Sequence, residues 1–373
     1  MTTAPAKRCV WAVDLGAGSG AKLGLVDVLP GHRIASEVHT ALLPREQYGS
    51  TGEELATRIS VLLKKLAQNM PGAEPLALGI ASPGLFRSDG SYFLVSNLGF
   101  LRDQNLPALL RHKLGVPVFI ENDANAGGLA EWDLARHALF YWVFGGGWGG
   151  AWISAQGGVR FPAVDWDGKD TSLHLTNEPG YATPILHADC RAVFDAEGIQ
   201  YDLFLDRLIE ADYMKGPDGR TDCFRAEGLL SGPGRWRLFR AVLDSLQIEL
   251  KSLGEPYATA FEKHITAGPY LQQFCEEGHQ AAYITEHIFG RVLGIGAKAI
   301  WLNAHRDGAQ GGLPVYLAGG PARLYDYFVP HAIEEMRKRE VPLRLMRSQI
   351  EARDENPNLR GAAVLAANRI RSA

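Results

Sequence analysis

An acid, an amide and a second acid close an apolar stretch about a third of the way along the chain. The segment FIENDANAGGLAEW, residues 119–132, places Glu121, Asn122 and Asp123 directly behind the apolar run VPVFI. Burying a carboxylate is costly unless the group is paired or hydrogen-bonded. The pattern has two interpretations. Either Asn122 or Asp123 caps the helix that follows, or the end of a strand presents polar groups to a ligand.

Three glycine-rich turns, each next to an apolar segment, could bind phosphate. They are DLGAGSGAKLGLVD (14–27), FGGGWGGAW (144–152) and LAGGPAR (317–323). Glycines let backbone N–H groups converge on an anion, and Asp14 in the first turn could hold a hydrated Mg²⁺. None matches the dinucleotide-binding fingerprint or the Walker A loop. A single turn of this kind is usually only a hairpin, but three together favour phosphate binding.

Hydrophobic periodicity and turn residues predict an α/β chain in which these motifs sit between strands and helices. The first and second glycine turns each open a block that continues into strands and helices, which suggests two similar halves facing each other across a cleft. The expected hairpins cover 9–28 and 139–159, and the expected single strands cover 75–86 (broken at Pro83-Gly84) and 116–120. The expected helices cover 51–69, 106–115, 125–138, 283–305 and 356–370. We also expect a mainly helical region over 189–282 and a strand, turn and helix over 313–339.

Composition narrows the class of protein. A chain of 373 residues is too long for one ordinary core, so two domains are expected. The net charge of −4 and a pI near 6.3 give no electrostatic footprint for nucleic acid or an anionic membrane. Four scattered cysteines favour a reducing, cytoplasmic setting. We expect no signal peptide and no membrane-spanning segment.

In sequence order, the motifs resemble those of the ROK family and of bacterial glucokinases, within the superfamily of hexokinase, actin and Hsp70. The most specific match is IENDANAGGLAE, which is close to the family's END-A signature. The others are the first and second glycine turns, ALGIASPGLF, SNLGF, NEPGYATP, RAEGLLSGPGRWRLFRAV, VYLAGGPARL and NLRGAAVLA. This resemblance implies a two-domain actin-like ATPase (ribonuclease H-like) α/β fold with the active site in the cleft. The expected domains are 1–121 with 357–373, and 122–356.

The resemblance also implies an ATP- and Mg²⁺-dependent kinase that phosphorylates a hexose hydroxyl, with glucose and its 6-position as the leading expectation. Asp123 would be the general base. The expected sugar-binding residues are Asn97, Asn122, Glu178 and Glu227. The expected phosphate- and nucleotide-binding residues are Asp14, Gly16, Gly18, Ser19, Gly145, Gly146, Gly147, Gly319 and Gly320, with Asp14 holding Mg²⁺ through water. From the residues alone, Glu178 could be a turn residue and Glu227 a solvated helix acid.

Several departures from the family pattern keep alternatives open. Gly18-Ser19 replace Gly-Thr, Tyr181 replaces a histidine, and the family's zinc motif is missing. His187 with Cys190 would give only two ligands, so we expect no structural zinc. The missing zinc motif, the SGPG segment and the lack of a helix-turn-helix segment before Asp14 favour the glucokinase branch over the repressors. The alternatives are a non-catalytic sugar sensor, a kinase for another sugar or polyol, and a donor such as polyphosphate. The family implies a homodimer.

Overall fold

The computed structural model describes residues 7–16, 20–30, 33–95, 97–165, 177–254 and 268–371. The chain divides into two compact units. Unit 1 comprises residues 1–141, 151–171 and 349–373, and unit 2 comprises residues 142–150 and 172–348. No helix among the described residues is both long and apolar enough to cross a membrane.

The five-stranded sheet of unit 1 has the strand order β3-β2-β1-β4-β7. β1 (Lys7–Leu15), β2 (Ala21–Leu29) and β3 (Arg33–Leu43) are antiparallel, and β4 (Ala73–Ser82) and β7 (Val118–Asn122) continue the sheet parallel to β1. The first expected hairpin is therefore present, but β3 was not predicted. The carboxyl ends of β1, β4 and β7 meet at one edge of this sheet, because the three strands run in the same direction.

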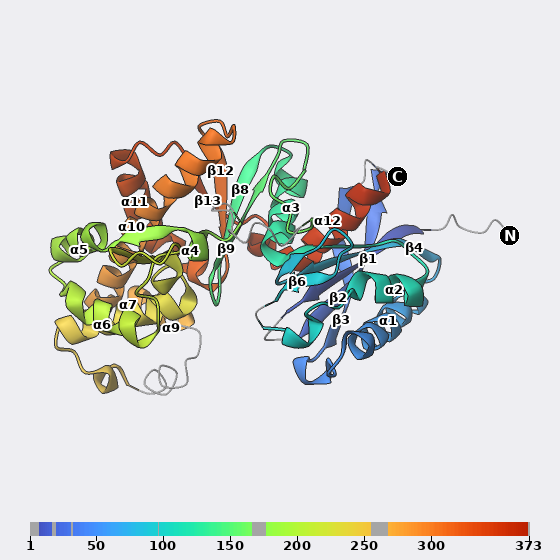
Figure 1. The fold of residues 1–373 in the computed structure, drawn as a ribbon, viewed down its shortest axis with the longest axis horizontal. Helices are drawn as coiled ribbons and strands as arrows, with labels where there is room; N and C mark the ends of the chain where they lie inside the picture. The colour runs from blue at the N-terminus through green and yellow to red at the C-terminus, as the bar shows by residue number, and fades with distance from the viewer. Residues whose placement is uncertain are drawn as a thin grey trace. The chain divides into compact units, whose positions relative to one another are not determined.

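Helices cover this sheet in two pairs (Figure 1). α1 (Gly52–Gln68) packs with α2 (Leu106–Leu114), and α3 (Asp123–Ala135) packs with α12 (Pro357–Arg371). α1 starts where the sequence predicts a helix, because the Thr51 side chain accepts the Glu54 N–H and caps it. The smaller strands β5 (Leu85–Phe86) and β6 (Tyr92–Leu94) form a separate pair, next to the turn at Gly99–Leu101, η3.

Unit 2 is built on the strand order β13-β12-β8-β9. β8 (Leu139–Phe144) and β9 (Trp148–Ile153) form the second predicted hairpin, and residues 142–150 at its tip belong to unit 2. β12 (Pro314–Ala318) and β13 (Arg344–Arg347) are parallel. The helices are α4 (Pro179–Ala182), α5 (His187–Ala196), α6 (Tyr201–Glu210), α7 (Gly232–Ser245), α9 (Gly268–Glu276), α10 (Gln280–Arg306) and α11 (Tyr325–Lys338).

The expected mainly helical region, 189–282, also contains part of a small sheet in the residues that the structure describes. β10 (Pro184–Leu186) pairs antiparallel with β11 (Cys223–Arg225). Short helical turns connect several elements: η2 (Arg45–Gln47), η4 (Ala226–Gly228), η5 (Leu250–Leu253), η6 (Gly320–Leu324) and η7 (Glu351–Arg353).

The units divide the chain at positions other than the expected domain boundaries. Residues 122–141 were expected in the second domain, but they lie in unit 1. Buried charges on α3 explain this placement. Glu131 accepts the backbone N–H groups of Gln349 and Ile350, and Asp133 forms a buried ion pair of 2.8 Å with Arg360 on α12. Since an unpaired buried charge is costly, these contacts hold α3 to the C-terminal segment.

Candidate functional site

The first group of predicted site residues lies where β7 passes into α3. Asn122 is the N-cap of α3, and its Oδ1 accepts the N–H of Ala124 at 2.9 Å and that of Asn125 at 3.4 Å. The capping interpretation is therefore correct for Asn122. Its Nδ2 makes one long contact, 3.4 Å, with the carbonyl oxygen of Gly84. The Nδ2 group thus keeps a hydrogen for a ligand, whereas the oxygen is already used.

Asp123 is the first residue of α3 and is partly exposed. Its Oδ1 accepts the Ala124 N–H at 2.9 Å, which orients the carboxylate. Burial, and then the negative charge of Asp14, raise the pKa of Asp123 from 3.8 to about 6. A carboxylate with a pKa near 6 is ionised at pH 7.5 and is also a stronger proton acceptor than an ordinary aspartate.

Asp14 lies at the same edge of the sheet, near the end of β1. It pairs in register with Ala81 of β4, and the following residue of β4, Ser82, pairs with Asn122 of β7. The Asp14 side chain is 7% exposed, and burial raises its pKa. Asn356 Nδ2 donates to Oδ2 at 2.9 Å and Asn358 Nδ2 donates to Oδ1 at 3.3 Å. The two amides orient the carboxylate and favour its charged form.

The two carboxylates fit a cation that is held mainly by a nucleotide and water. Asp14 and Asp123 raise each other's cost of ionisation, and a divalent cation near them would offset this repulsion. The described residues contain no cluster of three or more His, Cys, Asp or Glu side chains that could cage a metal ion. Mg²⁺ keeps several waters and takes few protein ligands, so one or two carboxylates together with phosphate are able to hold it.

The first glycine loop is described only in part. Gly16 follows β1, and its carbonyl oxygen accepts the hydroxyl of Tyr48 at 2.8 Å. Gly18 and Ser19 lie outside the described residues. Tyr48 is fully buried, and its hydroxyl fixes the start of the loop. Sequence reasoning missed Tyr48 because the contact joins segments that are 32 residues apart.

The second glycine loop, in unit 2, is a tight turn. The N–H of Gly145 donates to the carbonyl oxygen of Gly147 at 2.8 Å, and the N–H of Gly232 donates to that of Gly145 at 2.8 Å. Gly145 and Gly146 are exposed, and a Cβ at either position would meet no atom within 4 Å. Local packing therefore does not require glycine at these two positions. Close approach of a ligand to the backbone would require it.

Glu227 lies beside this loop, on η4. A Cβ at Gly147 would stand 2.9 Å from Glu227 Oε2, and the Tyr213 hydroxyl donates to Glu227 Oε1 at 3.1 Å. Burial raises the pKa of Glu227, which is only partly exposed. Glu227 is therefore not a solvated helix acid. Glu178 occupies the N-cap position of α4 without capping it through its side chain.

Tyr181, the residue that replaces the family's histidine, is 40% exposed. The guanidinium of Arg225 lies 4.2 Å from the centre of its ring, a cation–π contact. Asn97, the remaining predicted sugar-binding residue, is exposed just before η3 in unit 1. The His187 ring contacts the Tyr201 hydroxyl at 2.6 Å, and Cys190 is buried.

The third glycine loop follows β12. Gly319 has a φ of +91°, and a Cβ there would stand 2.0 Å from the carbonyl oxygen of Phe144, so only glycine fits. Gly320 begins η6. Arg235, which is fully buried on α7, donates to the carbonyl oxygen of Pro321 at 2.8 Å and forms an ion pair of 2.9 Å with Glu286 on α10.

Sequence reasoning missed this Arg235–Glu286 pair. The available signal was an arginine directly after the SGPG motif. The pair stabilises the third glycine loop, because Arg235 holds the carbonyl oxygen of Pro321 in η6 by a hydrogen bond. Within unit 1 the structure brings Asp14 and Asp123 to one sheet edge, and within unit 2 it brings Gly147 and Glu227 together. The assignment of roles to all these residues remains a prediction.

The fold and the polar strand ends together define the class: an α/β protein with the actin-like ATPase fold of ROK sugar kinases. Residues 31–158 match the sequence model of the ROK family, a range that contains the END-A signature, and the resemblance predicted from the motifs is confirmed. The matched range also contains ALGIASPGLF, SNLGF and the second glycine turn, whereas the first glycine turn and the motifs after residue 158 lie outside it.

Two solved structures cover nearly the whole chain. A ROK hexokinase from Thermus thermophilus is 21% identical with a TM-score of 0.63, and covers 98% of this chain and 100% of its own. A ROK family glucokinase from Streptomyces griseus, in complex with glucose and AMPPNP, is 18% identical with a TM-score of 0.60, and covers 96% and 99%. At these identities the likeness establishes the fold.

The curated relatives are named as xylose repressors and not as kinases. A xylose repressor from Caldicellulosiruptor bescii is 32% identical over 127 residues, which are 32% of this chain and 30% of the relative. The matched segments span only 25–31% of the length of the curated relatives. Kinase-like and repressor-like proteins are thus both similar to this chain.

Proposed function

We propose that this protein is an ATP- and Mg²⁺-dependent sugar kinase, with Asp123 as the general base and glucose as the first substrate to test. The observation that carries the proposal is the carboxylate of Asp123. It is held by a helix N-terminus, partly open to solvent, and raised in pKa to about 6 by burial and by Asp14. A purely structural cap would need neither the second acid nor this raised pKa.

The proposed reaction transfers the γ-phosphoryl group of ATP to the sugar. A sugar hydroxyl oxygen attacks the γ-phosphorus of ATP, its proton passes to Asp123, and the bond from phosphorus to the β,γ-bridging oxygen breaks to release ADP. Asn122 would donate a hydrogen bond to the sugar through Nδ2, since its oxygen is occupied by the cap. Mg²⁺, held through water by Asp14, would neutralise phosphate charge. In unit 2, Glu178 and Glu227 are proposed to accept further sugar hydroxyls.

The glycine loops are proposed to bind the nucleotide. Gly145, Gly146 and Gly147 would present backbone to the phosphates, together with Gly16 and with Gly18 and Ser19. Gly319 and Gly320 would lie against the nucleoside. Positioning and charge neutralisation supply most of the catalytic effect in phosphoryl transfer, so rigid loops at helix and strand ends suit the reaction.

The second candidate is a sugar-responsive regulator without turnover, since curated relatives are named xylose repressors. One experiment separates the two. Purified protein, ATP and Mg²⁺ are mixed with a panel of hexoses, xylose, amino sugars and polyols, and ADP release is measured for the wild type, for Asp123→Ala and for the exposed control Asp89→Ala.

Turnover with one sugar, lost in Asp123→Ala and kept in Asp89→Ala, would support the kinase and name its substrate. Absence of turnover together with thermal stabilisation by xylose or another sugar would support the regulator. Replacing ATP by polyphosphate in the same assay tests the alternative phosphate donor.

A further inference from the structure

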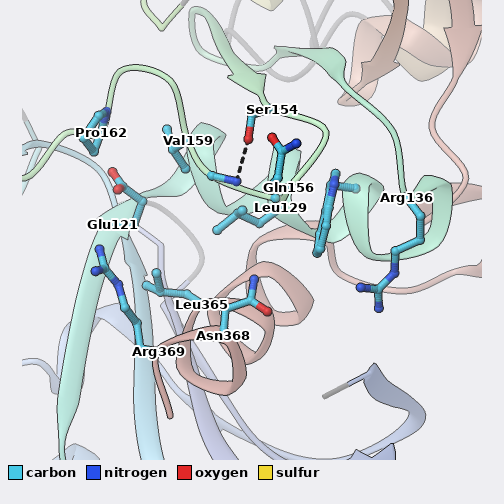
Figure 2. Close-up of a pocket in the computed structure, with 13 residues that line it drawn as sticks. Glu121, Leu129, Arg136, Ser154, Gln156, Val159, Pro162, Leu365, Asn368 and Arg369 are labelled. Carbon is cyan, nitrogen blue, oxygen red and sulfur yellow. Dashed lines mark hydrogen bonds between the residues drawn. The ribbon is translucent and has the colours of Figure 1, made fainter. Parts of the chain in front are cut away.

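A cavity lies within unit 1, behind the end of β7. It has a volume of about 760 Å³ and is formed by α3, α12 and the segment after β9 (Figure 2). None of the residues predicted to bind sugar, phosphate or nucleotide lines it. Its lining comprises Glu121, Leu129, Trp132, Arg136, Ser154, Gln156, Gly157, Gly158, Val159, Pro162, Leu365, Asn368 and Arg369.

Glu121 brings a buried charge to this cavity. Its side chain is 3% exposed, and the hydrogen bonds among the described residues use only one of its two oxygens. Oε1 accepts the N–H of Asn122 at 2.9 Å, the Nδ2 of Asn125 at 3.0 Å and the N–H of Ala163 at 2.8 Å. Within the part of the chain that the structure describes, Oε2 has no hydrogen-bond partner. Because Glu121 lines the cavity, Oε2 is available to accept a hydrogen bond from a ligand or from water there.

Arg369 brings the complementary positive charge. It is exposed on α12, and Figure 2 shows it near Glu121 on the wall of the cavity. Its charge lowers the pKa of Glu121 against the larger effect of burial. Among the described residues, Arg369 makes no hydrogen bond or ion pair at bonding distance. Arg136, in contrast, is already paired with Asp133 and stacked on Trp132.

The remaining lining suits a molecule that carries hydroxyl groups on a compact carbon skeleton. Ser154, Gln156 and Asn368 contribute polar side chains, and Leu129 and Trp132 contribute apolar area. The Ser154 hydroxyl already accepts the N–H of Gly158 at 3.0 Å and so fixes one wall. The volume falls within the roughly 300–1,000 Å³ of small-molecule sites.

We propose that this cavity binds a polyhydroxylated organic anion of monosaccharide size, either a sugar phosphate or a sugar acid. A hydroxyl of the ligand donates to Glu121 Oε2, and its anionic group pairs with Arg369. Because Glu121 Oε1 holds the backbone N–H of Asn122, the residue before Asp123, the occupied cavity acts on the strand end that carries the candidate base. The inference goes beyond the proposed kinase reaction and does not depend on it.

Binding is tested by isothermal titration of the full chain with glucose 6-phosphate, gluconate, glucose and inorganic phosphate as probes. The first two distinguish phosphate from carboxylate as the anionic group. The key variant is Arg369→Ala, and its control is Arg111→Ala, an exposed arginine on α2 that does not line the cavity. Glu121→Gln is the second variant, since it keeps an oxygen for the three N–H donors but changes the group that faces the cavity.

One sugar anion is expected to bind the wild type and Arg111→Ala equally, and to bind Arg369→Ala about tenfold to a hundredfold more weakly, since a charge-assisted hydrogen bond is lost. Glu121→Gln should also weaken it. Asp123→Ala should retain this binding, and the loss of affinity in Arg369→Ala separates it from product binding at the proposed kinase site, which does not include Arg369. Absence of binding by both anions, or affinity unchanged in Arg369→Ala, would overturn the proposal. Inorganic phosphate binding as tightly as the sugar anion would overturn the assignment to a polyhydroxylated ligand.

Discussion

Asp123 is predicted to reduce the stability of the fold that holds it, and Asp123→Asn tests this. The pKa of Asp123 is raised from 3.8 to about 6 in the folded protein. A raised pKa means that ionisation costs folding free energy: the cost is absent below about pH 4 and fully present above about pH 6. A difference of about 2 pKa units corresponds to about 3 kcal/mol, and partial exposure reduces this to about 1–2 kcal/mol.

Asparagine mimics the neutral acid at all pH values, so Asp123→Asn should unfold about 2–6 °C higher than the wild type at pH 8 and at the same temperature near pH 4. Thermal unfolding followed by circular dichroism across this pH range measures the difference. The matched control is Asp89→Asn, because the Ser91 N–H lowers the pKa of this exposed acid and the variant should gain no stability at pH 8. A wild type that is more stable than Asp123→Asn at pH 8 would refute the reasoning.

Three further predictions follow from other contacts. If Asp123 is the base, kcat/KM should fall as the pH drops, with a midpoint at about pH 6. In Asp14→Asn the midpoint of the residual activity should move to lower pH, because the charge of Asp14 raises the pKa of Asp123. A midpoint that does not move would contradict this coupling between the two carboxylates. Asn356→Ala removes the 2.9 Å hydrogen bond to Asp14 and the side-chain oxygen that accepts the Leu359 N–H. The free energy of unfolding, measured by urea titration, should therefore fall by about 1–2 kcal/mol. An unchanged free energy of unfolding would show that neither hydrogen bond contributes to stability. Gly319→Ala should destabilise by at least about 2 kcal/mol, because its φ and the Phe144 carbonyl exclude a Cβ. Its control, Gly146→Ala, should keep stability but raise KM for ATP.

Local sequence signals predicted most elements of the fold. Thr51, Asn105 and Asn122 cap helices where polar residues precede apolar periodicity, and the glycine turns separate the strands of both hairpins. β3 was missed, although the turn dipeptide Pro30-Gly31 precedes it in the sequence. β3 is defined in the structure by its antiparallel pairing with β2.

The candidate site was predictable where its residues are contiguous in sequence and not where distant segments support them. Asp123 stands out beside its neighbours, but the amides that hold Asp14 come from residues 342 and 344 positions away. The Arg235–Glu286 pair likewise joins two helices of unit 2. Burial and pairing of charges depend on tertiary packing, which no local pattern of one sequence specifies.

The central claim is that Asp123 accepts the proton as a sugar hydroxyl takes the γ-phosphate. A single-turnover experiment with γ-³²P-labelled ATP, Mg²⁺ and the sugar found in the panel measures this step directly. We predict that the label appears on the sugar with the wild type, and that Asp123→Asn transfers it about 10²–10⁴ times more slowly while binding the sugar with similar affinity. Transfer at the wild-type rate in Asp123→Asn, or label released only as inorganic phosphate, would contradict the account.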